Sequence, residues 1–346
     1  MSSCKEVVAV AMSGGVDSTV AAYLALQAGY RVIGINLLME PGKPQDPELL
    51  RSCEALGIEL FCHDCAKEFY ERVLLASARE YDAGRTPNPC CQCNYVLKFH
   101  ELLRCADRMG VEKVWTGHYV QLVEKDGLRL LQKGVDPGKD QSYFLYRLTQ
   151  KELSRVGFPL GGMTKSQVRE IAAAAALPCA VRKDSQDACF QISGECCGET
   201  LRRRCGLPVR SGFFIHQGRK VGRHNGIHRY TLGQRQGLNV ALGVPAYIKS
   251  ICAETGNIVL TTDQDELKSN SFTVRQISWQ SGSMPDEAMT VRVRYRSPGS
   301  PCAVTVNDDG SLLVEPETIQ RAVTPGQAAV FYCGDIVAGG GIIDHV

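Results

Sequence analysis

Three cysteines lie within four positions in the stretch TPNPCCQCN, residues 86–94. They are Cys90, Cys91 and Cys93, and two prolines precede them. Thiols clustered in this way can form a disulfide knot, bind zinc or iron, handle sulfur, or fill space in a core. Cys90 and Cys93 have the Cys-x-x-Cys spacing that metal sites and redox sites share. The cysteines alone leave these four alternatives open.

A second candidate site is the segment SGGVDS, residues 13–18. It follows the strand-like run EVVAVAM, residues 6–12, and precedes a helical pattern over residues 17–28. Two glycines allow the backbone N–H groups to approach an anion, and the start of a helix favours negative charge. Asp17 would repel a phosphate unless it caps the helix or holds Mg²⁺. No Gly-Lys-Ser/Thr is present, so this is not a Walker loop, but the context predicts nucleotide binding.

Length and composition bound the class of protein. The chain has 346 residues, 44% hydrophobic and 22% charged, which indicates a soluble globular protein of two or three domains. No apolar run is long enough to span a membrane, and the short apolar segment near the N-terminus ends in a glycine turn instead of resembling a signal peptide. We therefore expect a cytoplasmic protein without membrane contact. We expect its 16 cysteines to be reduced thiols more often than disulfides. Cys62-x-x-Cys65 is interpreted as structural, and the vicinal pair Cys196-Cys197 has no assigned role.

The elements that must position these residues follow two patterns. Strand-like and helical runs alternate over the first third of the chain, which predicts a parallel sheet covered on both faces. Residues 119–134 predict a hairpin that turns at Asp126-Gly127, and Thr164 with Gln167 predicts a capped helix over residues 164–176. Residues 200–250 are glycine-rich and irregular, whereas several short strands from residue 271 onward predict a small barrel or sandwich.

The charge is unevenly distributed, although the net charge is only +2. Residues 200–253 contain no Asp or Glu, which indicates a surface for a polyanion. A second basic row is Arg292, Arg294 and Arg296, whose period of two predicts one strand face, with Tyr295 on the other. The long basic stretch carries Arg202, Arg203, Arg204, Arg210, Arg219, Lys220, Arg223, Arg229, Arg235, Lys249, His216, His224 and His228.

The motifs resemble those of a known family. SGGVDS resembles the signature of the PP-loop ATP pyrophosphatases, which adenylate an oxygen atom of a substrate and release pyrophosphate. Seven further segments, in family order between residues 7 and 343, are similar to the tRNA-specific 2-thiouridylases, which replace the 2-oxygen of the wobble uridine with sulfur. These segments are AGRTPNPCCQCNYVLKF (83–99), TGHYV (116–120), KDQSYFL (139–145), DSQDACF (184–190), RYTLGQRQGL (229–238), VRYRS (293–297) and RAVTPGQAAVFY (321–332).

The resemblance implies roles for individual residues. Catalysis is expected from Cys93 and from Cys189, which matches the cysteine that carries a persulfide. ATP is expected to contact Ala11, Met12, Ser13, Gly14, Gly15, Val16, Asp17, Ser18, Leu37 and Gly117. Contacts with tRNA are expected from Asn88, Pro89, Cys90, His118, Lys139, Asp140, Gln141, Arg294, Tyr295 and Gln327, and the first three of these meet the target base.

Two sulfur-transfer mechanisms remain open. In the first, Cys93 attacks a persulfide on Cys189, hydrosulfide is released onto the adenylated base, and a Cys93–Cys189 disulfide remains. In the second, Cys90, Cys93 and Cys189 hold a 4Fe–4S cluster with one open iron. Cys90 prompts the second mechanism, because the family usually has Asp at this position.

The resemblance also implies a domain plan and partners. We expect a PP-loop α/β domain over 1–196, with part of a small central α+β domain inserted near 156–177. The tRNA-binding central domain then covers 197–270 and a C-terminal β-barrel covers 271–346. ATP, Mg²⁺, tRNA and a sulfur-donor protein, such as a cysteine desulfurase or a sulfur relay protein, would be needed. The alternatives are another PP-loop ligase that acts on a small molecule, and an RNA-binding protein whose cysteines store metal.

Overall fold

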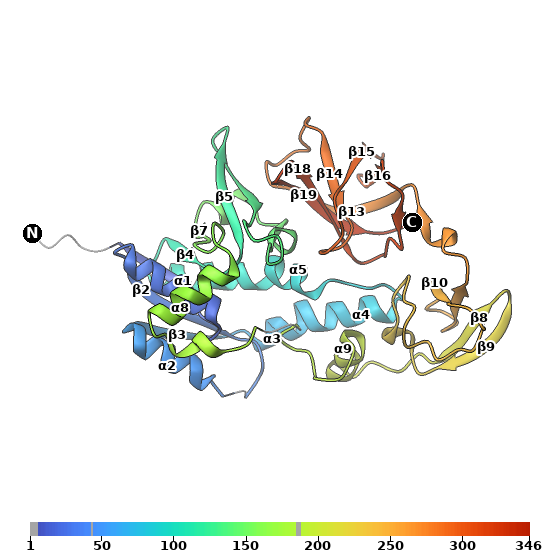
Figure 1. The fold of residues 1–346 in the computed structure, drawn as a ribbon, viewed down its shortest axis with the longest axis horizontal. Coiled ribbons are helices and arrows are strands. Elements are labelled where there is room, and N and C mark those ends of the chain that lie inside the picture. Colours follow the sequence, from blue (N-terminus) through green and yellow to red (C-terminus); the bar gives the residue numbers. More distant parts are fainter. Residues whose placement is uncertain (1–5, 43, 185–187) are drawn as a thin grey trace, which may run out of the picture.

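The computed structural model describes residues 6–42, 44–184 and 188–346. An N-terminal α/β domain lies at one end, and a long helical arm runs from it to a small central domain at the other end (Figure 1). The C-terminal β-barrel lies above this arm. The predicted class, a parallel α/β sheet followed by a small domain and a barrel, is confirmed. Across the described residues, no helix has the length and apolar character to cross a membrane.

The N-terminal domain is built on a five-stranded sheet with the order β3-β2-β1-β4-β7, in which every pair is parallel. Helices cover both faces, as the strand–helix alternation predicted. Its strands are β1 (Val7–Ala11), β2 (Arg31–Leu38), β3 (Glu59–Asp64), β4 (Lys113–Trp115) and β7 (Val156–Gly157). The helices of this domain are α1 (Val16–Gln27), α2 (Pro47–Leu56), α6 (Phe99–Arg108) and α8 (Lys165–Ala174).

Both faces of β1 are buried, which explains its uninterrupted apolar sequence. Val8 and Val10 pack in one core with Ala21 of α1. Ala9, which points to the opposite face, packs in another core with Leu102 of α6. Successive side chains of a strand alternate between faces, so a strand covered on both sides needs apolar residues at every position.

The helical arm consists of α3 (Ala66–Phe69), a π-helical segment (Tyr70–Leu75) and α4 (Ala76–Asp82), and α9 (Cys197–Cys205) packs against α4. After α4, the chain turns back toward the N-terminal domain through α5 (Pro89–Cys93) and a second π-helical segment (Asn94–Lys98), and it continues into α6. Prolines precede the three cysteines and restrict the backbone of residues 86–89. Residues 89–93 are helical, because Asn88 caps the helix and Pro89 occupies its first turn.

The predicted hairpin is confirmed as β5 (Val120–Lys125) and β6 (Leu128–Lys133). Its turn residues Asp126 and Gly127 both have positive φ, which suits a tight two-residue turn. The next helices are α7 (Gln150–Leu153) and α8, and α8 begins with the predicted capping box of Thr164 and Gln167.

Residues 156–177 do not pack as part of the central domain. β7 pairs with β4 at the edge of the parallel sheet, and α8 packs against α1. The buried residues Val168 and Ala172 of α8 share a core with Val16 and Val20 of α1. The apolar face of this helix is thus covered by the N-terminal domain.

The central domain is more regular than its glycine-rich sequence predicted. A four-stranded sheet has the order β10-β11-β8-β9. Its core contains Phe214, Ile248, Ile258 and Leu260. The strands are β8 (Gly212–His216), β9 (Arg219–His224), β10 (Tyr247–Ile251) and β11 (Ile258–Thr261).

The C-terminal barrel closes because β13 pairs with both β16 and β19. Strand β6 of the N-terminal hairpin also pairs with β19, through Gln132 and Ile336, a connection that the sequence did not predict. The strands are β13 (Phe272–Trp279), β14 (Met289–Arg292), β15 (Ser300–Val306), β16 (Leu312–Pro316), β18 (Ala328–Cys333) and β19 (Ile336–Ile343), with the short pair β12 (Lys268–Ser269) and β17 (Gln320–Arg321).

The predicted row of three arginines on one strand face is wrong. β14 ends at Arg292, and Arg294 and Arg296 lie in the turn that follows. Ser297 closes this turn through hydrogen bonds with the backbone N–H and carbonyl of Arg294, so the strand alternation does not continue.

Candidate active site

The phosphate loop, residues 13–18, connects β1 to α1. Ser18 Oγ donates a hydrogen bond to the carbonyl oxygen of Gly15 over 3.0 Å and accepts one from the N–H of Ser13 over 3.2 Å. Gly14 has a φ of +80°, and a Cβ there would lie 3.1 Å from Leu49 Cβ. The loop is thus folded tightly by its own hydroxyl groups, and Gly14 meets a need for positive φ and close packing.

The loop lies where the sheet changes direction. β1 lies between β2 and β4 in the sheet. The chain continues from β1 to β2 on one side, and β4 lies on the opposite side, so the strand order reverses at β1. Ligands of open α/β sheets bind where the strand order reverses. Gly117, which follows β4, packs so closely on α1 that a Cβ would lie 2.7 Å from the carbonyl carbon of Asp17. Leu37, at the end of β2, borders the same edge of the sheet. The predicted nucleotide residues therefore meet at one edge of the sheet.

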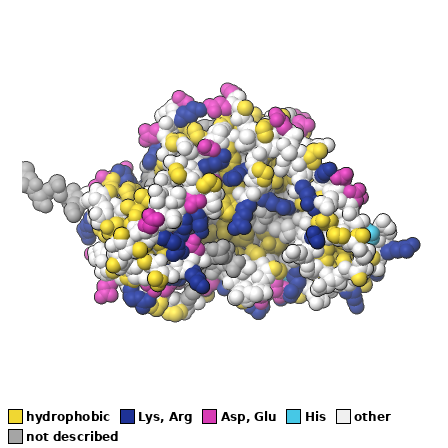
Figure 2. All heavy atoms as spheres, in the orientation of Figure 1, with side chains coloured by type: hydrophobic (Ala, Val, Ile, Leu, Met, Phe, Trp, Pro, Cys, Tyr) yellow, Lys and Arg dark blue, Asp and Glu magenta, His cyan; other side chains and the backbone are white. Residues whose placement is uncertain are grey.

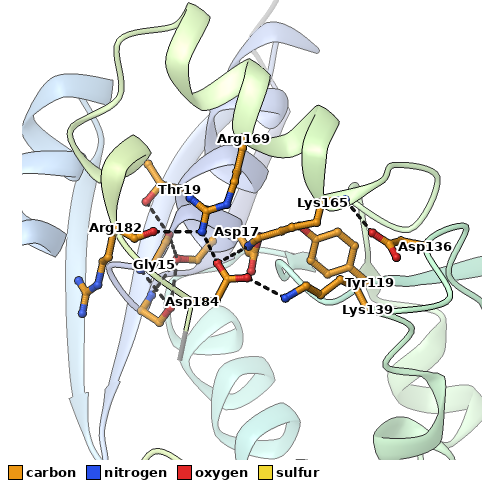
Figure 3. A network of polar contacts seen from close by, with 12 residues as sticks. Gly15, Asp17, Thr19, Tyr119, Asp136, Lys139, Lys165, Arg169, Arg182 and Asp184 are labelled. Carbon is orange, nitrogen blue, oxygen red and sulfur yellow. Dashed lines mark hydrogen bonds and ion pairs between the residues drawn. The ribbon is translucent and has the colours of Figure 1, made fainter. Parts of the chain in front are cut away.

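A network of charged side chains faces the phosphate loop (Figure 3). Lys165 Nζ lies 2.6 Å from Asp17 Oδ1 and 3.0 Å from Asp184 Oδ1. Lys139 and Arg169 also pair with Asp184, over 2.7 and 2.6 Å. Burial raises the pKa of Asp184, but hydrogen bonds from Lys139 and Lys165 outweigh it and hold this pKa well below its ordinary value. Asp184 is therefore ionised, and the cations outnumber the two carboxylates.

Arg182 adds a further cation beside the loop. Its Nη1 donates to the carbonyl oxygen of Gly14 over 3.0 Å and pairs with Asp46. Sequence reasoning assigned no role to Lys165, Arg169 or Arg182. The basic residues between 165 and 183 were visible in the sequence, but only the packing of α8 on α1 brings them to the loop.

The segments that carry the two predicted catalytic cysteines pack together. Cys93 is buried in a core with Phe69 and Phe190, and Ala188 packs against the same core. The rings of Phe69 and Phe190 lie 6.3 Å apart. Because Ala188 and Phe190 flank Cys189, this packing brings the Cys189 segment to α5. Residues 185–187 of the DSQDACF motif lie outside the described residues.

The environment of Cys93 keeps its thiol protonated at rest. Burial raises the pKa of Cys93 to about 12; Lys98 opposes this shift, and the charges of Cys189 and Cys90 add to it. Cys90 is exposed at the surface, but the protein around it still raises the pKa of its thiol by desolvation, and the charge of Cys189 adds to this shift. In both shifts, the charge of Cys189 acts on a thiol of α5.

The structure gives no support to a metal cluster at these thiols. Within the described ranges, no group of three or more His, Cys, Asp or Glu side chains is arranged to hold a metal ion. Cys90, Cys93 and Cys189 therefore do not form a ligand set for iron as they stand. Cys62 and Cys65 have separate partners, since Cys62 Sγ accepts from Gln45 and Cys65 Sγ donates to the carbonyl oxygen of Leu38.

Comparison with known proteins assigns the family. Models described as a tRNA methyl transferase HUP domain, a tRNA methyl transferase PRC-barrel domain and an aminomethyltransferase beta-barrel domain match residues 6–193, 204–262 and 269–343. A tRNA-specific 2-thiouridylase of Syntrophotalea carbinolica is 41% identical, over 96% of this chain and 97% of its own. The chain belongs to the tRNA-specific 2-thiouridylase family. A second 2-thiouridylase, of Chloroflexus aurantiacus, is also 41% identical, over 97% of this chain and 98% of its own.

Among solved structures, a 4-thiouridine synthetase in complex with RNA and bound ATP is a partial match. The TM-score is 0.39 at 16% identity, with 58% of this chain and 50% of the other chain covered.

Several residues that the 2-thiouridylase motifs nominate for tRNA contact also make contacts inside the protein. Asp140 is buried, and its carboxylate accepts hydrogen bonds from the N–H groups of Gly134 and Ser142. Gln141 Oε1 accepts from the N–H of Tyr119 over 2.9 Å. These two side chains hold the loop after β6 in place, whereas Lys139 pairs with Asp184 beside the phosphate loop.

His118 lies in an aromatic setting. Its Nδ1 is 2.8 Å from Thr116 Oγ1, and its ring packs against Phe99 and Phe158. Burial holds the pKa of His118 well below its ordinary value, so the imidazole is neutral. His118 is therefore a half-buried, neutral histidine packed among aromatic rings.

The predicted contacts in the barrel are anchored to other parts of the chain. Arg294 Nη2 donates to the carbonyl oxygen of Ala322 over 2.5 Å, and burial lowers the pKa of this guanidinium. The ring of Tyr295 lies 4.5 Å from that of Phe144. Gln327 Nε2 donates to the carbonyl oxygens of Thr86 and Pro87, just before α5.

The residues that were expected to meet the target base lie at the start of α5. Asn88 Oδ1 accepts from the N–H of Cys91 over 3.1 Å, Pro89 is buried and Cys90 is exposed. On the face in Figure 2, Lys and Arg side chains lie on both sides of a hollow with hydrophobic side chains at its centre. Such a hollow suits a polyanion that inserts one base.

Proposed function

We propose that this protein replaces the C2 oxygen of the wobble uridine of tRNA with sulfur, at the expense of ATP. The observation that carries the proposal is the packing of the Cys93 and Cys189 segments together, in a member of the 2-thiouridylase family with a phosphate loop at the switch point of its sheet.

The first step is activation of the uridine. The C2 oxygen attacks the α-phosphorus of ATP, pyrophosphate leaves, and the oxygen becomes part of an adenylate that can depart as AMP. The N–H groups and hydroxyls of the phosphate loop, with Lys165, Arg169 and Arg182 around it, supply positive charge for the phosphates. The base must leave its stack to reach this site.

Magnesium would act on the phosphates. Mg²⁺ is commonly bound by one or two carboxylates together with substrate phosphates, and Asp17 is one such carboxylate. Asp17 Oδ1 already accepts hydrogen bonds from Tyr119 and Lys165, which leaves this carboxylate fewer free positions for a metal ion. The phosphate oxygens of ATP would therefore have to supply other ligands of Mg²⁺. When bound, the ion would neutralise charge on the departing pyrophosphate.

The second step is sulfur transfer through the two cysteines. Cys189 carries a second sulfur as a persulfide, and the Cys93 thiolate attacks the Sγ of Cys189. A Cys93–Cys189 disulfide forms as hydrosulfide leaves, and the hydrosulfide attacks C2 of the adenylate and displaces AMP. The proton of Cys93 must leave before the attack, since burial keeps its pKa high. A dithiol reductant then returns both cysteines to thiols.

Cys189 is solvent-exposed, which suits reloading by a sulfur-donor protein such as a cysteine desulfurase or a sulfur relay protein. Reduced thiols and tRNA are both found in the cytoplasm, where we infer that the reaction occurs. The described thiols do not form a cluster site, so we derive no step through iron.

The experiment is thiolation of unmodified tRNA with ATP and a sulfur source, followed by nucleoside mass spectrometry. Iron-free protein should yield 2-thiouridine, with release of pyrophosphate that depends on tRNA. Product only after anaerobic reconstitution with iron would overturn the persulfide route in favour of a cluster. Pyrophosphate release at the same rate with and without tRNA would instead indicate a ligase that acts on a small molecule.

A further inference from the structure

The carboxylate of Asp184 is shared by three cations from two parts of the chain. Lys139 Nζ lies 2.7 Å from it, Arg169 Nη2 lies 2.6 Å from it, and Lys165 Nζ lies 3.0 Å from it. The side chain of Lys139 is 36% exposed, whereas that of Lys165 is 12% exposed. An RNA phosphate can therefore reach Lys139, while Lys165 is largely covered by the protein.

Lys165 also connects Asp184 to the phosphate loop. The same ammonium group lies 2.6 Å from Asp17 Oδ1, which in addition accepts a hydrogen bond from the hydroxyl of Tyr119 over 2.7 Å. One cation is thus divided between two carboxylates (Figure 3). When one of these carboxylates loses another cation, the negative potential there increases, and the shared ammonium group is drawn toward it.

The backbone that carries these side chains is held in place. The carboxylate of Asp136 accepts one hydrogen bond from the N–H of Gly138 and one from the N–H of Lys165, each over 2.9 Å. Asp136 therefore ties the loop that carries Lys139 to the start of α8. Because this backbone is fixed, a change of partner at Lys139 reaches Asp17 through movement of side chains.

We propose that Lys139, Asp184 and Lys165 couple the binding of tRNA to the binding of ATP. In the protein without tRNA, Lys165 pairs with Asp17. When Lys139 leaves Asp184 for an RNA phosphate, Asp184 attracts Lys165 more strongly, and Asp17 Oδ1 loses one of its two donors. Asp17 then has a free position for a metal ion on the phosphates of ATP. This inference rests on the proposed function, for which it names the residues that make ATP binding depend on tRNA.

The coupling acts in both directions. A ligand of the phosphate loop that engages Asp17 releases Lys165 toward Asp184, which weakens the attraction between Asp184 and Lys139. Thermodynamic linkage requires that tRNA tightens ATP binding by the same factor by which ATP tightens tRNA binding. Such factors are typically about 5- to 150-fold, and we expect about tenfold here.

The test measures the Kd of α,β-methylene-ATP, with Mg²⁺ present, in the absence and in the presence of saturating unmodified tRNA. This analogue cannot release pyrophosphate, so the measurement reports binding alone. Wild-type protein should bind it about tenfold more tightly with tRNA than without. Lys139→Gln and Asp184→Asn should each reduce this ratio to about 1, because each removes one group of the relay. The change of net charge alters both Kd values in the same direction and therefore largely cancels in the ratio.

Two further variants are controls. Lys139→Arg keeps a cation that can pair with a carboxylate or with a phosphate, so it should retain most of the coupling. Lys113→Gln removes an ion pair of the same length, 2.7 Å from Lys113 Nζ to Glu6, at the start of β4. It should retain the coupling in full.

The outcomes separate this inference from the proposed function. If tRNA leaves the Kd of the analogue unchanged in wild-type protein that still forms 2-thiouridine, the coupling is absent and the proposed function stands. An unchanged ratio in either Lys139→Gln or Asp184→Asn would also overturn the inference, because the coupling would then use other residues. Failure of the wild-type protein to thiolate tRNA, measured in parallel, would instead overturn the proposed function and, with it, this inference.

Discussion

Gln327 of the barrel donates hydrogen bonds from its Nε2 to the carbonyl oxygen of Thr86, over 2.7 Å, and to that of Pro87, over 3.1 Å. Thr86 also donates its N–H to Pro325, and its Oγ1 lies 3.2 Å from Oγ1 of Thr231 in the central domain. The segment that leads into α5 is therefore held by both other domains. The position of Cys93 depends on contacts that lie far from it in sequence.

Gln327→Ala should slow thiolation, because it leaves two backbone carbonyls without their donor at a cost of about 1–3 kcal/mol. We expect roughly a tenfold loss of turnover with the Kd for ATP unchanged. Single-turnover thiolation and ATP titration measure the two quantities. Gln320→Ala, which removes a local bond to Thr318 in the same domain, is the control. Equal activity of both variants would mean that the Thr86 contacts do not position α5.

Cys93→Ala and Cys189→Ala should each reduce 2-thiouridine formation by at least about a thousandfold. Each variant lacks a sulfur atom at which bonds form or break during sulfur transfer. Release of pyrophosphate in the presence of tRNA should persist, since adenylation precedes sulfur transfer. Cys105→Ala, another buried cysteine, controls for the loss of a core thiol and should remain active. Full thiolation by either catalytic variant would contradict the two-cysteine route.

Cys90→Asp separates the two mechanisms for sulfur transfer. Cys90 is exposed and takes no part in the persulfide route, so the variant should thiolate tRNA within about twofold of the wild-type rate. A loss of activity together with a loss of bound iron in reconstituted protein would show that Cys90 is a cluster ligand.

The rate of sulfur transfer should rise with pH. Burial raises the pKa of Cys93 to about 12, so below that value only the small thiolate fraction can attack. That fraction grows about tenfold for each pH unit, and the single-turnover rate between pH 7 and 9 should follow it. Lys98→Met should lower the rate at every pH, because Lys98 favours the thiolate. A flat profile would mean that a step other than Cys93 attack limits the reaction.

Lys165→Met should raise the KM for ATP by about tenfold or more, because a charge-assisted contact of this kind contributes about 1.5–3 kcal/mol. The substitution also removes a positive charge that pairs with the carboxylates of Asp17 and Asp184, so the negative charge beside the phosphate loop increases. Lys165→Arg should recover part of the loss, and Lys151→Met, an exposed lysine of α7, should have no effect. ATP titrations of the adenylation step measure all three, and an unchanged KM would remove Lys165 from the phosphate site.

The elements that depend on local sequence could be predicted from the residues. The covered strand β1, the Asp126-Gly127 turn and the capping box at Thr164 each follow from a few neighbouring side chains. The phosphate loop could also be predicted, because its glycines and hydroxyl groups shape the backbone within a few neighbouring residues.

Features that depend on distant packing could not be predicted. The acids that neutralise the basic stretch include Glu40 and Asp82, which reach it only after the arm and α9 have packed. Lys165 and Asp17 are 148 positions apart and meet because α8 covers α1. The alternation of Arg292 and Arg294 is typical of a strand, but β14 ends at Arg292 and hydrogen bonds with Ser297 close a turn that starts at Arg294.

The pairing of β6 with β19 has a consequence for synthesis of the chain. The β5–β6 hairpin leaves the ribosome with the N-terminal half, but its partner strand follows about two hundred residues later. Until then, the N–H groups of Leu131 and Lys133 at the outer edge of β6 lack their acceptors on Gln280 and Asp335, and such an edge can recruit a strand from another molecule. A chain that stalls or is cut before β19 should therefore aggregate through this hairpin, even where its parallel sheet is complete.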